Sequence, residues 1–401
     1  MHRVVITGLG PVSSIGIGAS AFRRSLRAGR SGISRITSFD PSGFPHVNGG
    51  EVPGFAPDRL LRRLVPDRWG RSSQFAAAAA RLAADDARLP AGEIRAGRGG
   101  AVLGTTSGES QVVEAITGQL LENSFEAVPG ELFAQAPAGR LAAAVCEELG
   151  LTGESLTLAT ACSASNYAIA YAYDCLAHGE ADVMFAGGAD SVCRWAHAGF
   201  YRLGALTADA CSPFDLNRSG IITGEGGAVL LMETLDHATA RGARIYAELL
   251  GKGINCDANH MVAPHAETIA ECMRLAHRDA GVKPAEVDYI SAHGTGTPTN
   301  DAVEARAAAE VFGARMPPIS SIKSMLGHTM GAASGFGAIA SALAIAYGFL
   351  PPTINWHTPD PELGGLDPVP NTARAAKVRI VQNNGFAFGG NNAITILGAC
   401  S

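Results

Sequence analysis

One cysteine and two histidines in this 401-residue chain stand in small-residue, glycine-rich surroundings that fit covalent catalysis. Cys162 lies in Thr-Ala-Cys-Ser-Ala-Ser (160–165), His293 in Ala-His-Gly-Thr-Gly-Thr (292–297), and His328 closes Lys-Ser-Met-Leu-Gly-His (323–328). A thiolate is a strong nucleophile toward thioesters, and imidazoles transfer protons or donate hydrogen bonds near neutral pH. These three residues predict acyl transfer through a thioester on Cys162.

The surroundings of Cys162 indicate how the thiol is activated. We expect a short strand over 156–161 and a helix over 163–177, with the cysteine at their junction. The positive end of a helix dipole favours a thiolate, and the free backbone N–H groups there hold an oxyanion. The alternative is a buried structural cysteine, which is the usual fate of a free thiol. We expect that fate for Cys146, Cys175, Cys193, Cys211, Cys256, Cys272 and Cys400.

The two histidines share one local pattern, in which a strand ends, small residues follow and a helix begins. Lys323 belongs to the second of these loops. Residues at strand ends commonly face a cleft. Metal ligation is the rival interpretation, but it lacks a third nearby ligand, and a metal would compete for the thiol. Glycine-rich segments at 223–227 and 385–390 do not have dinucleotide-binding spacing, so we interpret them as tight turns beside a ligand or as plain surface turns.

Short apolar strands alternate with alanine-rich helical stretches, which predicts an α/β protein. The segment 331–347 is apolar on nearly all sides, so we place it between layers as a helix. Two halves are indicated by a strand running into a glycine-rich turn at 4–10 and again at 287–294. The other expected strands are 101–103, 183–186, 228–233, 319–321, 380–383 and 393–397, and the other expected helices are 71–86, 164–177, 267–280 and 301–311.

The composition excludes several classes of protein. The net charge of −6 argues against a nucleic-acid partner. Eight cysteines without a Cys-x-x-Cys pair argue against disulfides and zinc, and they fit a reducing cytoplasm. The start of the chain does not read as a signal peptide. The charge-free run 324–359 is broken by polar residues and adjacent prolines before the roughly 20 apolar residues that a membrane span needs. We therefore expect a cytoplasmic protein without a membrane partner.

Taken together, these motifs resemble the β-ketoacyl-acyl-carrier-protein synthases of the elongating, Cys-His-His type. Further matching segments lie at 5–10, 186–189, 213–215, 224–226 and 388–392, in the order that the family has them. The resemblance implies a thiolase-type fold, in which two similar α/β halves form a five-layered αβαβα core. We expect the halves to be 1–245, with the nucleophile, and 246–401, with both histidines.

The resemblance implies a decarboxylative Claisen condensation between an acyl group on Cys162 and malonyl-acyl carrier protein. Phosphopantetheine arrives on the carrier protein, and no cofactor of the enzyme's own is implied. His293 and His328 would polarise the malonyl thioester carbonyl, and Lys323 would orient or support His328. The backbone N–H groups of Cys162 and Phe388 would form an oxyanion hole. The other implied roles are a gate at Phe388 and Gly389, supporting acids at Asp301 and Glu304, and an acyl pocket near Phe200, Thr106 and Phe133.

The chain departs from the family pattern at three positions. Gly337 stands where elongating fatty-acid enzymes carry a glutamate, so support for Lys323 would come from Glu304. Ala387 replaces a glycine before the gating phenylalanine, and Asn391 replaces a threonine. If residue 387 has a positive φ, alanine costs roughly 1–2 kcal/mol there. These departures favour a specialised ketosynthase of a polyketide or unusual fatty-acyl pathway.

Several alternatives stay open or are disfavoured. A ketosynthase-like acyltransferase that passes the acyl group to an amine or alcohol would not need both histidines, and housekeeping fatty-acid elongation remains possible on these residues. A thiolase would place a second cysteine in a Cys-Gly turn, where Cys400 does not lie. An initiating synthase would carry asparagine at the place of His328, and a chain-length factor would lack Cys162.

The implied partners are an acyl carrier protein and a second subunit, which is either the same chain or a chain-length-factor-like subunit. A cluster of arginines is a docking patch for the acidic carrier or an ordinary solvated face. It consists of Arg62, Arg63, Arg68 and Arg71.

Overall fold

A single hydrogen-bonded path of ten strands runs through the molecule, in the order β12-β11-β15-β16-β10-β1-β9-β7-β5-β6, with the short β2 (Gly16–Ile17) paired to β1. The computed structural model describes residues 1–90, 92 and 98–401. The first five strands of the path along the chain are β1 (Val4–Ser13), β5 (Gly99–Gly104), β6 (Ser155–Leu158), β7 (Val183–Asp190) and β9 (Gly226–Thr234). The last five are β10 (Ala247–Cys256), β11 (Tyr289–Ser291), β12 (Ile319–Ser320), β15 (Ile380–Phe386) and β16 (Asn391–Gly398).

The two sets of five strands have the same topology. Numbered within its own set, each runs third, second, fourth, fifth, first from the outer edge to the middle. In both sets the first three strands of that path are parallel and the next two pairings are antiparallel. The sets meet where β1 pairs with β10 over Val4, Val5 and Ile6 only. The predicted pair of similar α/β halves is therefore confirmed.

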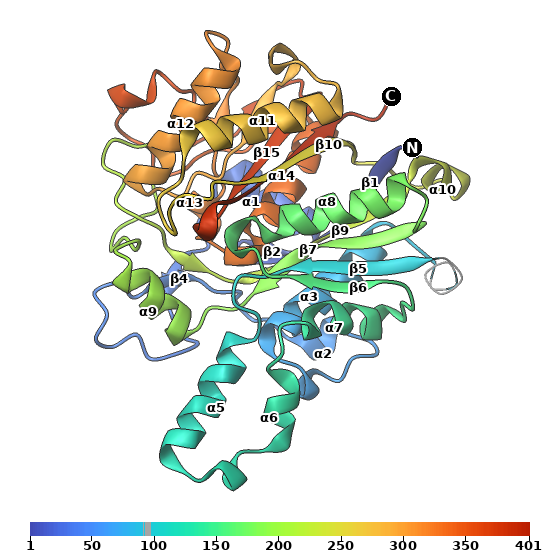
Figure 1. Cartoon of the computed structure of the whole chain (residues 1–401), viewed down its shortest axis with the longest axis vertical. Coiled ribbons are helices and arrows are strands. Elements are labelled where there is room, and N and C mark those ends of the chain that lie inside the picture. Colours follow the sequence, from blue (N-terminus) through green and yellow to red (C-terminus); the bar gives the residue numbers. More distant parts are fainter. Residues whose placement is uncertain (91, 93–97) are drawn as a thin grey trace.

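Each set of five strands forms one sheet layer. Helices lie outside both of these layers and between them, which makes five layers in all (Figure 1). The outer face of the first half is covered by α3 (Arg71–Asp86) and α7 (Arg140–Leu149), and that of the second by α11 (Ala266–Ala280) and α12 (Pro298–Phe312). Between the sheets lie α8 (Ala164–Ala177) and α14 (Ala333–Tyr347). The segment Met330–Tyr347 is long and apolar enough to cross a membrane, but 83% of it is buried inside the protein. It is the predicted helix between layers.

Glycine is where the structure differs from the sequence-based expectations. The segment 4–10 is not a strand followed by a turn, because β1 continues through Gly8 and Gly10. A Cβ at these glycines would lie 2.1 and 1.8 Å from backbone oxygens of α3, so glycine allows the helix to pack closely on the strand. The counterpart of β1 is β10, which the sequence analysis missed, and not the strand before His293. Gly251 and Gly253 interrupt the apolar pattern of β10 and give α11 the same close approach.

The two central helices begin with the same unusual turn. A 3₁₀ turn precedes each of them, over Ala161–Ser163 before α8 and Met330–Ala332 before α14. Each turn starts with a non-glycine residue in the left-handed region, Ala161 at φ 50° and Met330 at φ 52°. Such residues are uncommon and mark strained backbone. Cys162 and Gly331 occupy the equivalent second position of the two turns.

Two helices project away from the layers. These are α5 (Ser110–Glu122) and α6 (Gly130–Gln135), at the bottom of Figure 1. They and the short turn between them expose large apolar side chains, and the rings of Phe125 and Phe133 lie 5.6 Å apart. Apolar patches of this kind mark interaction surfaces.

Candidate active site

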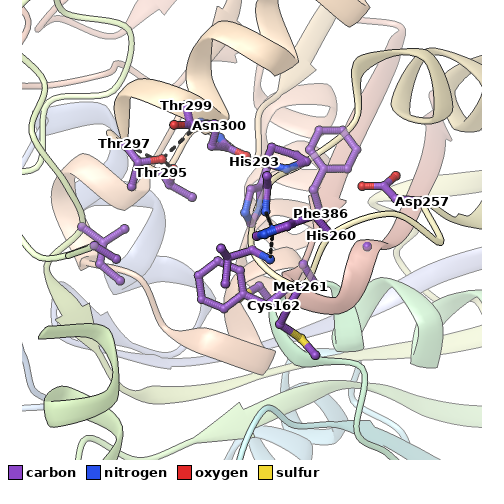
Figure 2. Close-up of a pocket in the computed structure, with 18 of the residues that line it drawn as sticks. Cys162, Asp257, His260, Met261, His293, Thr295, Thr297, Thr299, Asn300 and Phe386 are labelled. Atoms are coloured by element: carbon purple, nitrogen blue, oxygen red, sulfur yellow. Dashed lines mark hydrogen bonds between the residues drawn. The ribbon is translucent and has the colours of Figure 1, made fainter. Parts of the chain in front are cut away.

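Cys162, His293 and His328 line one cavity of about 80 Å³, together with Phe200 and Phe388. Figure 2 shows Cys162 and His293 on the wall of this cavity. Cys162 is presented by the turn before α8, in the first half. His293 follows β11, His328 follows α13 (Lys323–Leu326), and Phe388 lies between β15 and β16, all in the second half. The structure therefore brings the predicted nucleophile and both predicted imidazoles together across the two halves.

Cys162 is 5% exposed, and this burial dominates the acidity of its thiol. Burial raises the pKa of Cys162 to about 12. Lys323 acts in the opposite direction, as do hydrogen bonds from the backbone N–H groups of Cys162 and Phe388. The expected net stabilisation of a thiolate is therefore wrong for the free enzyme, because desolvation outweighs the favourable groups. Those same groups are placed to stabilise negative charge that develops at this point.

His328 is held as a neutral hydrogen-bond donor. Its backbone N–H donates to Ile222 O at 2.6 Å, and its carbonyl accepts from Gly224 N at 2.9 Å. The ring Nδ1 accepts from Met330 N at 3.0 Å, so the proton of the neutral ring is on Nε2. Burial, and then Lys323, hold the pKa of His328 well below its usual range. The glycine-rich segment that begins at 223 thus positions a histidine.

His293 is clamped through its peptide groups. Its N–H donates to Glu304 Oε1 at 2.9 Å, and its carbonyl accepts from Lys323 Nζ. Its ring meets the His328 ring edge to face, with centroids 5.7 Å apart and planes at 79°. Burial is the main cause that keeps the pKa of His293 well below its usual range, with Lys323 and His328 adding to it. Both imidazoles are therefore neutral at pH 7.

Lys323 and two buried acids organise this loop. Lys323 Nζ donates to the backbone carbonyl of His293 and not to the His328 ring. Burial lowers the pKa of Lys323, while Glu304 opposes that effect. Glu304 also accepts from Gly294 N at 2.7 Å, and Asp301 accepts from Thr295 N at 3.0 Å. These carboxylates bind the turn that carries His293.

In the loop of the predicted gate, Gly389 needs glycine and residue 387 does not. Gly389 has φ 82°, and its N–H donates to Met261 O at 2.7 Å. Ala387 has φ −143° and ψ 156°, which is ordinary extended backbone. The strain expected for alanine at 387 is therefore absent. The Phe388 ring lies 6.2 Å from the Phe200 ring and closes one side of the cavity.

The space beside Gly337 is filled by an asparagine. A Cβ on Gly337 would lie 2.3 Å from Asn383 Oδ1 and 3.1 Å from Ser291 Oγ. Asn383 is itself fixed, because its Nδ2 donates to Asn166 Oδ1 at 2.9 Å. This chain has no room for the family's glutamate at position 337.

Two residues predicted to line the acyl pocket are elsewhere. Phe200 lines the cavity, but Thr106 and Phe133 are not among its lining residues. The backbone N–H of Thr106 donates to buried Asp190 at 2.7 Å, and Phe133 lies on the projecting α6.

Part of the cavity wall was not predicted from the sequence. Asp257 and His260 line it from the loop after β10, a loop that could not be placed while β10 was unrecognised. The His260 ring Nδ1 accepts hydrogen bonds from the backbone N–H groups of Val262 and Ala263 (Figure 2). The Thr295 and Thr297 hydroxyls, which belong to the His293 motif, also line the cavity and bond to each other at 2.8 Å.

Comparison with known proteins identifies the family. Residues 1–238 match the model for the beta-ketoacyl synthase N-terminal domain, and residues 246–357 match that for the C-terminal domain. The chain is 39% identical to "3-oxoacyl-[acyl-carrier-protein] synthase 2" of Coxiella burnetii, over 99% of this chain and 98% of that protein. The chain belongs to the β-ketoacyl synthase family, and it is an enzyme of the acyltransferase class.

Solved structures show the same fold. The structure titled "The ishigamide ketosynthase/chain length factor" superposes with a TM-score of 0.98 and 49% identity, covering all of both chains. A second structure is a type II polyketide synthase acyl carrier protein in complex with its ketosynthase. It matches with a TM-score of 0.92 and 31% identity, again over the full length of both chains. The predicted thiolase-type ketosynthase fold is confirmed.

Proposed function

We propose that this site condenses a Cys162-bound acyl group with malonyl-acyl carrier protein, releasing CO₂ and giving a β-ketoacyl thioester. The observation that carries this proposal is the meeting of one thiol and two neutral imidazoles in one buried cavity. Neutral N–H donors suit an enolate oxygen, because they stabilise its charge without having to lose a proton first. Two imidazoles are more than a simple acyl transfer to an amine or alcohol requires.

The first half-reaction loads the enzyme. The sulfur of Cys162 attacks the acyl thioester carbon, the carbonyl oxygen gains negative charge, and the N–H groups of Cys162 and Phe388 stabilise it. The carbon–sulfur bond to phosphopantetheine then breaks. The thiol proton leaves with the phosphopantetheine sulfur, and the acyl group stays on Cys162.

The second half-reaction forms the carbon–carbon bond. His328, through Nε2–H, and His293 donate to the malonyl thioester oxygen while the carboxylate departs as CO₂ and its electron pair forms the enolate. The enolate carbon attacks the acyl carbon on Cys162, and the thiolate is expelled. The hydroxyls of Thr295 and Thr297 are placed to hydrogen-bond the amide-rich phosphopantetheine arm. The arm comes with the carrier protein, and no resident cofactor is part of this scheme.

We assign the enzyme to a polyketide or specialised fatty-acyl pathway. Its 49% identity to a ketosynthase/chain-length-factor structure supports this, as do the changes at Gly337 and Ala387. Housekeeping elongation is the second candidate, because 3-oxoacyl carrier-protein synthases are among its relatives. The division into halves at 245/246 and a cytoplasmic location belong to the same proposal. Eight unpaired cysteines support that location.

We further propose that a second subunit covers the β6 edge and the projecting α5 and α6. The strand β6 is the partly exposed end of the sheet path, and an open edge is a template for pairing. A chain-length-factor-like subunit is the partner that the 49% identical structure supports. Thr106 and Phe133 then border the pocket only in the assembled pair.

Intact-protein mass spectrometry tests the proposed function. The chain is incubated with a panel of acyl carrier proteins and then with malonyl carrier protein, with and without a co-expressed chain-length-factor-like subunit. We expect an acyl adduct that is absent from Cys162→Ala and disappears as a two-carbon-extended β-ketoacyl product forms. An adduct that is never extended but moves to an added amine or alcohol would refute condensation. Extension with the chain alone would refute the need for the second subunit.

A further inference from the structure

Buried polar side chains connect α11 to the loop of His293. His277 Nε2, on α11, lies 2.7 Å from Gln382 Oε1, on β15. Gln382 Nε2 donates to Asn384 Oδ1 at 2.8 Å, and Asn384 Nδ2 donates to Glu304 Oε1 at 2.8 Å. None of these four residues is more than 4% exposed. They lie between the sheet of the second half and its outer helices, on the side where Figure 1 shows α11 and α12.

The direction of these hydrogen bonds is fixed from the Glu304 end. A carboxylate only accepts, so Asn384 must turn its NH₂ group to Glu304 and its oxygen to Gln382. Gln382 must then turn its own NH₂ to Asn384 and its oxygen to His277. His277 must therefore donate from Nε2–H. Each amide could otherwise flip, and a flipped Asn384 would place its oxygen against the Glu304 carboxylate.

The surroundings of His277 keep it a neutral donor. Its Nδ1 has no hydrogen-bond partner within the part of the chain that the structure describes. His277 borders a surface hollow together with Arg274, Arg278 and Lys283, and the edge of the Phe312 ring packs on it at 5.5 Å. Both arginines are themselves ion-paired, Arg274 with Glu310 and Arg278 with Glu271. Burial is the main cause that lowers the pKa of His277, while its hydrogen bond with Gln382 acts in the opposite direction.

We infer that His277 is a remote positioning residue for His293. Through Gln382 and Asn384, this series of hydrogen bonds orients a side-chain N–H toward Glu304. Glu304 accepts from the N–H of His293, and Lys323 donates to the carbonyl of His293. Hydrogen bonds in series polarise one another, so a change at His277 affects the hydrogen bond between Glu304 and the N–H of His293. This inference rests on the proposed function, because it assigns the effect to the decarboxylation and condensation step. None of the hydrogen bonds of this relay of His277, Gln382, Asn384 and Glu304 goes to Cys162 or to the N–H of Phe388. We therefore expect acyl loading not to depend on the relay.

Two variants test the relay, His277→Leu and the volume-conserving Gln382→Met. Loading of Cys162 is timed by mass spectrometry, and condensation is timed separately on pre-acylated enzyme in a single turnover. We expect loading to be unchanged and condensation to slow by about threefold to tenfold, the effect of one hydrogen bond. The double variant should be no slower than the slower single one, because both changes cut the same chain. His277→Gln, which keeps an N–H donor at similar reach, should restore most of the rate.

Phe312→Leu is the matched control, because it alters packing against the His277 ring and removes no hydrogen bond. It should leave both steps unchanged, and melting temperatures identify any variant that has merely lost stability. Equal slowing of loading and condensation, or unchanged condensation in stably folded relay variants, would overturn the inference. A wild-type chain that loads but never condenses would instead refute the proposed function, so the two failures are distinguishable.

Discussion

At the scale of single residues, burial keeps the thiol and both imidazoles of the site neutral. The thiol has a raised pKa, and the pKa values of both imidazoles and of Lys323 are lowered. Negative charge on the thiol sulfur and on the thioester oxygen is therefore created only when substrate arrives, and the donors that meet it are already in place. Because the donors do not have to move, the free-energy cost of reorganising the site during the reaction is small. The raised pKa of the thiol also makes Cys162 a slow nucleophile in the free enzyme.

Alkylation of Cys162 should reflect that burial. With a pKa of about 12, the thiolate fraction rises about tenfold for each pH unit between 7 and 10, so we expect the iodoacetamide reaction to accelerate by that factor. Lys323→Ala should slow alkylation at each pH, because Lys323 lowers the pKa of the thiol. Mass spectrometry measures the rate, and Cys162→Ala accounts for labelling of exposed Cys256. A rate that levels off near pH 8 would contradict the buried, neutral thiol.

Residue type and motif spacing predicted Cys162, His293 and His328 as reactive residues, and the family resemblance added Lys323. The structure brings these four residues together, and their roles stay predictions. The sequence could not predict the surroundings of these residues. The φ of Ala387 is a property of the folded loop, and only the structure shows that alanine is unstrained there. The contact between Lys323 and the His293 carbonyl likewise depends on how two loops meet.

At the scale of secondary-structure elements, the packing of α14 against β15 decides what position 337 accepts. We expect Gly337→Glu to lower the free energy of unfolding by roughly 3 kcal/mol, because a side chain would collide with Asn383 and bury a charge. Ala346→Glu adds the same side chain on an exposed turn of the same helix and should be nearly neutral. Urea unfolding compares the two variants. A stable and active Gly337→Glu protein would show that Asn383 moves aside.

Elements were predictable where apolar residues follow a clear period. All five predicted helices are present, and α3 and α8 have the predicted bounds. The pattern failed in β1 beyond residue 7 and in all of β10, where glycines face a helix. In those strands, close packing of backbone on backbone replaces side-chain burial, so the apolar alternation that identifies a strand is lost.

At the scale of the whole molecule, only part of the arginine cluster is available to a partner. Arg71 pairs with buried Glu225, and Arg62 pairs with Asp85. Arg63 and Arg68 are exposed, and no ion pair of theirs is found among the described residues. Of the cluster interpreted from the sequence as a docking patch or a solvated face, these two arginines remain as candidates for docking a carrier protein.

Reversing these two charges tests the patch. Arg63→Glu with Arg68→Glu should raise the KM for carrier-bound acyl chains by about tenfold at low salt, with kcat unchanged, because encounter slows and chemistry does not. The effect should shrink in 0.5 M salt as charges are screened. Arg315→Glu, an exposed reversal in the second half, serves as the control. Unchanged kinetics at low salt would remove the patch from the docking surface.

The repeated turn before α8 and α14 determines how the catalytic residues are divided between the two halves. The same left-handed entry presents Cys162 in one half and Gly331 in the other, and a side chain at Gly331 would strike Thr105 of the first half. Only the turn before α8 can therefore carry a nucleophile, and the half of the molecule that contains this turn contains neither catalytic histidine. If the chain were cut between its halves, each fragment would be inert by construction. Recovered turnover would then be a direct readout of reassembly, which makes the fold a natural split reporter.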